Sequence, residues 1–200
     1  MTTLCFGGSF NPVHNAHLAC SQAAARHAGF DRVLLIPSHQ PVLKAKAYDL
    51  ASAEHRLAML ILAAESVATP DLAYDIDPLE LDRHGPTYTI DTVEALRKRG
   101  MDRVHWLIGA DQLLSLHRWH RFPELIKHTQ FHVMQRPGYA IDWSLVHRDA
   151  RSLKSHVVPV PQLDVSATDI RNRVRDGKPI DKLVPPKVRE YILRHRLFIP

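Results

Sequence analysis

The sequence predicts a single α/β domain built on a doubly wound, mostly parallel sheet. Short runs rich in Val, Ile and Leu alternate along the chain with longer helical patterns, which is typical of βαβ units. A length of 200 residues fits one well-buried domain, and 45% hydrophobic with 24% charged residues is ordinary for a globular protein. In such a fold we expect the ligand site at the carboxyl ends of the strands, where the strand order reverses.

The predicted strands occupy residues 3–6, 32–37, 72–81, 104–109, 130–135 and 156–160. Helices are predicted near residues 15–28, 52–66, 89–99, 121–128, 167–176 and 186–195. The helix near 89–99 has the clearest boundaries, because a Gly85–Pro86 turn precedes it and Gly100 follows it. Its expected N-cap is Thr87 or Thr89. Residues 38–50 show no periodicity and are predicted to form a functional loop.

The charge and composition exclude several classes of protein. A formal net charge of +5 suggests an anionic partner, but the Lys and Arg residues are scattered, so we do not expect nucleic acid. The longest apolar stretch, residues 57–68, is too short for a bilayer, and we expect neither a membrane span nor a targeting segment. Cys5 and Cys20 lack CxxC spacing and fit the reduced thiols of a cytoplasmic protein. The dispersed histidines argue against structural zinc.

The turn after the first predicted strand has the sequence GGSFNPVHNAHL, residues 7–18. It is neither a P-loop nor a dinucleotide fingerprint. Gly7 and Gly8 would let the backbone approach an anion, and His14 and His17 lie one helical turn apart on the same side. Paired imidazoles can donate hydrogen bonds to phosphate oxygens. The alternative is a helix N-terminus with two histidines by chance.

A second anion-binding pattern lies late in the chain, in DVSATDIRNRV at residues 164–174. Ser166 is the expected N-cap, with Thr168 beside it and Arg171 one turn further on. A capped surface helix with an ordinary arginine is the alternative. Two helix N-termini with such side chains are suited to a nucleoside triphosphate, because dipoles and donors stabilise phosphoryl charge.

These two motifs resemble those of the nucleotidyltransferase superfamily with its (H/T)xGH signature. The matching patterns are G-G-[ST]-F-[DN]-P-x-H-x-[GA]-H and [IV]-S-x-T-x-[IV]-R, with Ala16 and Ala167 in place of the commoner glycine and serine. Three further stretches resemble the nicotinate-nucleotide adenylyltransferases in particular: PSHQPVLK at 37–44, LELDRHGPTYTIDTVEAL at 79–96 and LIGADQLLSLHRW at 107–119. The resemblance spans nearly the whole chain.

The resemblance implies a Rossmann-like nucleotidyltransferase fold over residues 1–200, with about 164–200 as a helical phosphate-binding extension of the same domain. It also implies adenylyl transfer from ATP to nicotinate mononucleotide in NAD biosynthesis, giving nicotinate adenine dinucleotide and pyrophosphate. Mg²⁺ would be bound through phosphates and water, without a protein ligand cage. A homo-oligomer is compatible with this expectation.

By the same resemblance, the catalytic residues would be His14, His17 and Arg171. The ATP site would contain these three residues together with Gly7, Gly8, Ser9, Phe10, Ser166 and Thr168. The mononucleotide site would contain Lys44, Thr87, Tyr88, Asp111, Trp119 and Arg136.

Four of the mononucleotide-site assignments have an alternative. Asp111 could be a simple helix N-cap, Trp119 a core residue, and Lys44 and Arg136 solvated surface charges. At the level of function, the alternatives are an adenylyl- or cytidylyltransferase for another phosphate ester, such as phosphopantetheine, and a non-catalytic nucleotide sensor.

Overall fold

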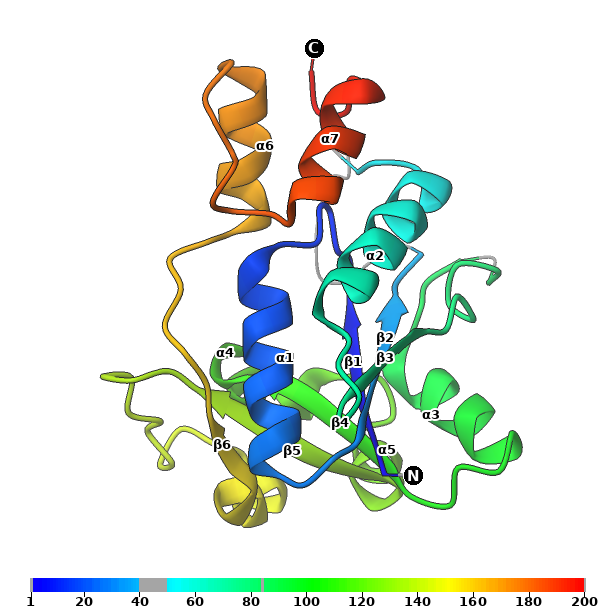
Figure 1. The fold of residues 1–200 in the computed structure, drawn as a ribbon. Helices are drawn as coiled ribbons and strands as arrows, with labels where there is room; N and C mark the ends of the chain where they lie inside the picture. The colour runs from blue at the N-terminus through cyan, green and yellow to red at the C-terminus, as the bar shows by residue number, and fades with distance from the viewer. Residues whose placement is uncertain (1, 40–49, 84, 200) are drawn as a thin grey trace.

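A six-stranded parallel sheet forms the centre of the computed structural model, which describes residues 2–39, 50–83 and 85–199 (Figure 1). The strands are β1 (Thr3–Gly8), β2 (Arg32–Pro37), β3 (Ala73–Ile76), β4 (Val104–Gly109), β5 (Thr129–Gln135) and β6 (Val157–Pro159). Their order is β3-β2-β1-β4-β5-β6, and every neighbouring pair is parallel. The predicted doubly wound sheet is therefore confirmed, with its order reversing between β1 and β4.

The predicted helices are present, with ends that differ by a few residues. They are α1 (Asn15–His27), α2 (Ala53–Val67), α3 (Thr89–Lys98), α5 (Phe122–His128), α6 (Ala167–Arg175) and α7 (Pro186–Arg194). Three short elements were not predicted: α4 (Ala110–Ser115) and the 3₁₀ helices at Leu116–Arg118 and Arg148–His156. No helix among the described residues is long and apolar enough to cross a membrane.

The end of one strand and the N-cap of one helix differ from the sequence prediction for local reasons. The predicted strand 72–81 ends at Ile76, because Asp77 turns the chain by accepting a hydrogen bond from the N–H of Leu79 at 3.0 Å. The N-cap of α3 is Tyr88, whose side chain makes no capping hydrogen bond, so neither predicted threonine caps this helix. Gly100 follows the C-cap with a φ of 94°, as its predicted role as terminator requires.

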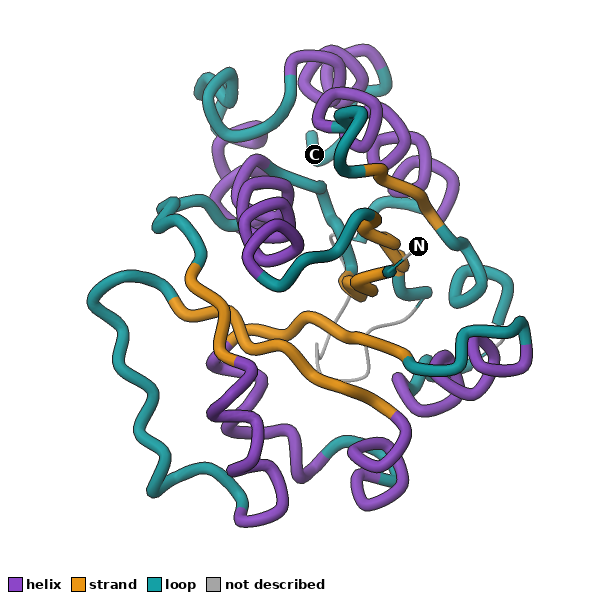
Figure 2. Tube along the Cα trace, turned by 60° about the horizontal axis from the view of Figure 1, so that its bottom comes forward, coloured by secondary structure: helices purple, strands orange, loops and turns teal. Residues whose placement is uncertain are grey.

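Helices cover both faces of the sheet (Figure 2). Each face buries its own apolar cluster. The first cluster joins β1 and β2 to α1, α2, α6 and α7, and the second joins β4 and β5 to α3, α4 and α5. Buried side chains of both helical layers therefore hold the strand ends in a fixed relation to one another.

The C-terminal part of the chain packs back onto the beginning of α1. Ile170, Val174, Val188 and Ile192 belong to the same buried cluster as residues of α1 and α2. The N–H of Asn15 also donates to the carbonyl oxygen of Leu183 at 2.9 Å. In Figure 1 the chain rises from β6 to α6, which lies beyond the N-terminal end of α1. The two motifs predicted to bind anions therefore come from opposite ends of the chain and meet at one end of the sheet.

Candidate active site

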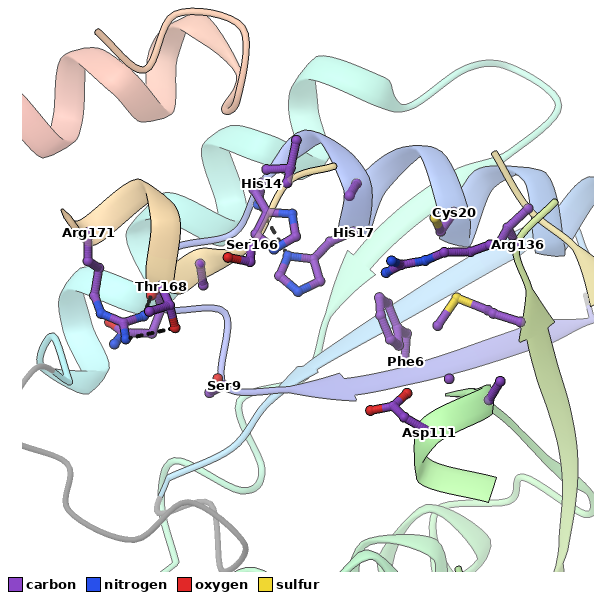
Figure 3. Close-up of a pocket in the computed structure, with 18 of the residues that line it drawn as sticks. Phe6, Ser9, His14, His17, Cys20, Asp111, Arg136, Ser166, Thr168 and Arg171 are labelled. Carbon is purple, nitrogen blue, oxygen red and sulfur yellow. Dashed lines mark hydrogen bonds between the residues drawn. The ribbon is translucent and has the colours of Figure 1, made fainter. Parts of the chain in front are cut away.

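A pocket of about 670 Å³ lies at the carboxyl ends of β1, β4 and β5, where the strand order reverses. Its volume is in the range of sites that bind small molecules. Most of the polar side chains that line it come from the two predicted motifs and from the ends of β4 and β5. They include Ser9, Asn11, His14, His17, Asp111, Arg136, Ser166, Thr168 and Arg171 (Figure 3).

His14 and His17 lie together at the start of α1. His14 is the N-cap residue, with an extended backbone, and its N–H donates to Nδ1 of His17 at 3.2 Å. The two imidazole rings stack with centroids 3.6 Å apart and an interplanar angle of 22°. The prediction that these side chains lie on the same side is therefore confirmed, and the stack presents ring N–H groups beside a helix N-terminus.

Phe10 supports this pair from behind and is not part of the pocket wall. Its side chain is 1% exposed, and its ring meets the ring of His17 edge to face, with centroids 5.1 Å apart. Its φ of 44° places it in the left-handed region, which turns the chain sharply between β1 and α1. Phe10 therefore fixes the position of His17 and does not itself face the pocket.

Gly7 and Gly8 also stay outside the pocket lining. A Cβ on Gly7 would lie 2.5 Å from Cζ2 of Trp106, and a Cβ on Gly8 would lie 3.2 Å from Cζ of Phe10. The two glycines are needed for packing inside the protein. Their role in letting the backbone approach an anion stays a prediction, and the contacts that would exclude a Cβ are with aromatic side chains.

The N-terminus of α6 supplies the second group of side chains. The Ser166 hydroxyl accepts a hydrogen bond from the N–H of Asp169 at 3.1 Å, which confirms the predicted N-cap. Arg171 donates to the carbonyl oxygen of Asn11 at 2.9 Å and to the Thr168 hydroxyl at 3.3 Å. These bonds hold the guanidinium across the gap between the β1–α1 turn and α6, beside the pocket.

Asp111 and Arg136 line the part of the pocket formed by β4 and β5. The alternative that Asp111 is the N-cap is wrong, because Gly109 is the N-cap of α4 and its N–H donates to Oε1 of Gln112 at 2.9 Å. Asp111 lies in the first turn of this short helix, with its carboxylate folded over Gly109. In Figure 3, Asp111 lies across the cavity from His17, Ser166 and His14.

Cys20, one turn beyond His17 on α1, also lines the pocket. Burial raises the pKa of its thiol, and Arg136 acts in the opposite direction. The thiol donates to the carbonyl oxygen of Pro161 at 3.6 Å. Cys20 therefore contributes a neutral wall to the pocket.

Three residues assigned to the mononucleotide lie outside the pocket lining. Thr87 and Tyr88 precede α3, where the Tyr88 ring stacks on that of His120 with centroids 4.2 Å apart. Trp119 is half-buried against the second apolar cluster and meets Phe131 edge to face at 6.2 Å. Its Nε1 is enclosed and has no hydrogen-bond partner in the part of the chain that the structure describes. Lys44 falls outside the described residues.

Two residues with direct roles in the geometry were not singled out from the sequence. Asn11 lies within the first motif, and its side chain accepts a hydrogen bond from the N–H of Ala51 at 3.0 Å. Arg56 is 1% exposed and contacts the carbonyl oxygen of Ser9, which lines the pocket. The sequence does carry a signal for Arg56. It precedes Leu60 by four positions and Ala63 by seven, and this spacing places it with them on the buried face of α2.

The donor set of the pocket is suited to anions. Imidazoles, the guanidinium groups of Arg136 and Arg171, and hydroxyls line it, and among the described residues the carboxylate of Asp111 is the only one in the lining. Within residues 2–39, 50–83 and 85–199, no group of three or more His, Cys, Asp or Glu side chains is placed to hold a metal ion. A divalent cation that keeps water and phosphate ligands needs no such group, so these residues fit Mg²⁺ carried by a polyphosphate.

Comparisons with known proteins give the family. The family model for cytidylyltransferase-like proteins matches residues 5–173. A Bacillus pumilus protein named "Probable nicotinate-nucleotide adenylyltransferase" is 38% identical, over 96% of this chain and 96% of its own. A Yersinia enterocolitica protein of the same name is 40% identical, over 94% of this chain and 90% of its own.

Solved structures share the fold. The nicotinic acid mononucleotide adenylyltransferase of Plasmodium falciparum, complexed with NaAD, gives a TM-score of 0.74 at 18% identity, over 99% of this chain and 98% of its own. A putative nicotinate-nucleotide adenylyltransferase from Vibrio parahaemolyticus gives 0.69 at 19% identity, over 99% and 96%. These structures support the fold, and the family model with the sequence matches shows that this chain belongs to the cytidylyltransferase-like family and, within it, to the nicotinate-nucleotide adenylyltransferases.

Proposed function

We propose that this protein transfers the adenylyl group of ATP to nicotinate mononucleotide, forming nicotinate adenine dinucleotide and pyrophosphate. The observation that carries the proposal is that two helix N-termini, those of α1 and α6, meet at one pocket. They bring His14 and His17 to the same cavity as Thr168 and Arg171. Such an arrangement is suited to a triphosphate, because helix dipoles and N–H donors stabilise negative charge.

In the proposed reaction, the 5′-phosphate of the mononucleotide attacks the α-phosphorus of ATP, and pyrophosphate leaves. No nucleophilic side chain is needed, so catalysis consists of positioning and charge stabilisation. His14 and His17 would donate to the phosphates at the reacting centre. Ser166, Thr168 and Arg171 would hold the β- and γ-phosphates, and the guanidinium would stabilise the charge that develops on pyrophosphate. Ser9 would contact the phosphates from the β1–α1 turn, with Gly7, Gly8 and Phe10 supporting that turn.

The mononucleotide would bind toward β4 and β5. Asp111 would accept hydrogen bonds from a ribose hydroxyl, and Arg136 would face an anionic group. We also propose that Thr87, Tyr88 and Trp119 surround the pyridine ring and its carboxylate, although they lie beyond the pocket lining. Lys44 completes the proposed set. Mg²⁺ would supply charge neutralisation on the phosphates when bound, through phosphate oxygens and water.

Residues 1–200 would form one domain, with about 164–200 as its helical extension, because the C-terminal helices share a buried cluster with α1 and α2. Every residue that it uses comes from a single chain. A cytoplasmic location is part of the proposal and is supported by Cys5 and Cys20, which are both buried and not bonded to each other.

The test is to incubate the purified protein with ATP, Mg²⁺ and a panel of acceptors, and to measure pyrophosphate and the dinucleotide product. Nicotinate mononucleotide is expected to react fastest, and nicotinamide mononucleotide and phosphopantetheine are the competing acceptors. Pyrophosphate released only with another acceptor would replace the proposed substrate. ATP binding without turnover of any acceptor would favour the nucleotide sensor instead.

Arg171→Ala tests the site within the same assay. We expect its kcat to fall by roughly 10²-fold or more, as when one preorganised donor to developing charge is removed. Arg175→Ala is the matched control, because Arg175 is exposed on the same helix and does not line the pocket. Equal rates for the two variants would remove Arg171 from the mechanism.

A further inference from the structure

Arg56 is a buried guanidinium whose hydrogen-bond partners, among the described residues, are all main-chain carbonyl oxygens. Its Nη1 donates to Ser9 at 2.9 Å and to Ser38 at 2.6 Å, its Nη2 to His39 at 3.3 Å and its Nε to Ala51 at 3.1 Å. The side chain is 1% exposed, although it carries a full charge. A buried cation of this kind is retained only where its hydrogen bonds are well satisfied.

The four carbonyl groups come from three different parts of the chain. Ser9 belongs to the turn between β1 and α1, Ser38 and His39 follow β2, and Ala51 precedes α2. A lysine ammonium could not span the same set, since its donors radiate from one atom, whereas a planar guanidinium presents five N–H groups in a fixed fork. Arg56 therefore fixes three segments relative to one another at the carboxyl end of the sheet.

Hydrogen bonds from Arg56 and from Ala51 hold the β1–α1 turn at two points. Arg56 donates to the carbonyl oxygen of Ser9, while the N–H of Ala51 donates to the side chain of Asn11. The carbonyl oxygen of Ala51 accepts from Arg56 in turn. The turn from Ser9 to Asn11 is thus held at both ends, and Phe10 between them lies in the left-handed region.

The same turn connects Arg56 to the phosphate-binding groups. Arg171 donates to the carbonyl oxygen of Asn11, and Asn11 lines the pocket together with Ser9 and Arg171. Figure 3 shows the last two. His14 follows three residues later as the N-cap of α1. A shift of this turn would therefore move the groups from both helix N-termini relative to each other.

We propose that Arg56 is a positioning residue, which sets the geometry of the polyphosphate site through the carbonyl groups of Ser9, Ser38, His39 and Ala51. It does not touch the substrates. Its guanidinium is hydrogen-bonded to the carbonyl group of Ser9, which belongs to the pocket wall. The positive charge of Arg56 therefore increases the attraction of that wall for anions. This inference rests on the proposed function for its kinetic consequences, and on the observed hydrogen bonds for the positioning itself.

The test compares Arg56→Ala with Leu60→Ala, a buried residue one turn further along the same helix. Both variants lose buried contacts, but Leu60→Ala leaves the four carbonyl bonds intact. At a temperature where both are fully folded, we expect Arg56→Ala to lower kcat by about 10- to 100-fold, the scale of a misplaced reacting group. Its affinity for ATP should weaken several-fold, and the KM for the acceptor should change less than threefold.

Added guanidinium ion distinguishes positioning from general stability. It can enter the space left in Arg56→Ala and restore part of kcat, and it should not accelerate Leu60→Ala or the wild-type protein. A folded Arg56→Ala protein with wild-type kcat and ATP affinity would overturn the inference. So would an equal loss of kcat in Leu60→Ala.

Two further measurements keep the outcome clear. If Arg56→Ala does not fold, Arg56→Lys carries the test, with about a tenfold loss of kcat expected and wild-type kcat overturning the inference. If the wild-type protein binds ATP but forms no dinucleotide, the proposed function fails on its own. Calorimetry with ATP alone then decides the role of Arg56, and an unchanged Kd in Arg56→Ala would exclude it.

Discussion

The main-chain N–H of His14 donates to Nδ1 of His17 at 3.2 Å, and the imidazole rings of the same two residues stack. A ring nitrogen that accepts a hydrogen bond carries no proton, so the neutral His17 side chain must carry its proton on Nε2. The backbone of the helix N-cap therefore selects the tautomer of His17. The result is an N–H donor on a residue that lines the pocket.

This tautomer leads to a prediction for three substitutions at residue 17. His17→Ala should lower kcat by roughly 10²-fold or more, because one donor to developing charge is lost. His17→Gln should retain more activity than His17→Asn, because only the glutamine amide reaches the position of Nε2. The measurement is kcat under saturating ATP and acceptor. Near-normal turnover of His17→Ala, or a more active asparagine variant, would contradict the prediction.

The sequence was sufficient for the parts of the site that lie close together along the chain. The spacing of His14 and His17, and the Ser166 cap with Thr168 and Arg171, follow from helix geometry and could be predicted. That the two motifs meet follows only from the resemblance, because the meeting depends on packing between α1 and the C-terminal helices. Arg56 was missed for the same reason, since its partners lie in separate segments.

Gly7 has a packing role that the motif alone does not show. The motif suggested close approach to an anion, whereas the space for a Cβ is filled by the Trp106 ring from the neighbouring strand β4. Cross-strand packing of this kind cannot be obtained from spacing along one strand. The sequence shows that a glycine is present, and only the structure shows which atoms exclude a larger residue.

We therefore predict that Gly7→Ala lowers stability before it affects chemistry. The new methyl group would overpack a ring that is 3% exposed, at a cost of about 1–3 kcal/mol, which corresponds to a Tm lower by about 2–4 °C per kcal/mol. Calorimetry of wild-type and variant measures this shift. Trp106→Phe in the Gly7→Ala background is the control and should cost less than it does alone, because the clashing atom is gone. Additive losses would exclude the clash.

The ends of the strands and the shortest helices were less predictable than the long elements. All six strands were predicted, but β3 is shorter than expected because Asp77 and Pro78 turn the chain after Ile76. The short α4 was missed because six residues are too few to show a helical period. Its N-terminus nevertheless carries Asp111 into the pocket, so a small element with no pattern of its own shapes the candidate site.

A histidine cluster on β4 and β5 predicts a loss of stability in acid. Nδ1 of His105 lies 3.1 Å from Nε2 of His132, and His156 lies beside them. Burial lowers the pKa of His132 to about 4, and His105 and His156 act in the same direction. Burial also lowers the pKa of His105, with contributions from Arg103 and His156. The folded state therefore favours neutral imidazoles here.

The sign of the effect follows from which state binds protons first. The unfolded imidazole, with a pKa of about 6.5, protonates before the buried one, so stability falls as the pH drops from about 6.5 toward 4. For His132 alone the loss between pH 7.5 and 5 is about 2 kcal/mol. His132→Gln should reduce this loss, as measured by urea unfolding at the two pH values. The exposed His27→Gln is the control, and an equal reduction there would contradict the assignment.

Trp119 has two possible roles, and its surroundings bear on both. The ring packs against Phe131 in the second apolar cluster, which supports a contribution to the core. It is only half-buried, however, and its Nε1 has no hydrogen-bond partner among the described residues. A buried donor without a partner is costly, so a ligand that moved the ring enough to reach Nε1 would bind more tightly.

We predict that Trp119→Ala raises the KM for nicotinate mononucleotide by about 10- to 100-fold, since stacking on a base contributes about 1–3 kcal/mol. The KM for ATP should change by less than about threefold, because the proposed phosphate-binding groups line the pocket and Trp119 lies outside its lining. Trp119→Phe should restore most of the loss by keeping an aromatic face. Trp143→Ala is the matched control, because Trp143 packs against the same cluster and has no proposed contact with either substrate. It should lower Tm and leave both KM values unchanged. If Trp119→Ala likewise lowers only Tm, or raises both KM values equally, Trp119 is a core residue and another aromatic side chain must hold the pyridine ring.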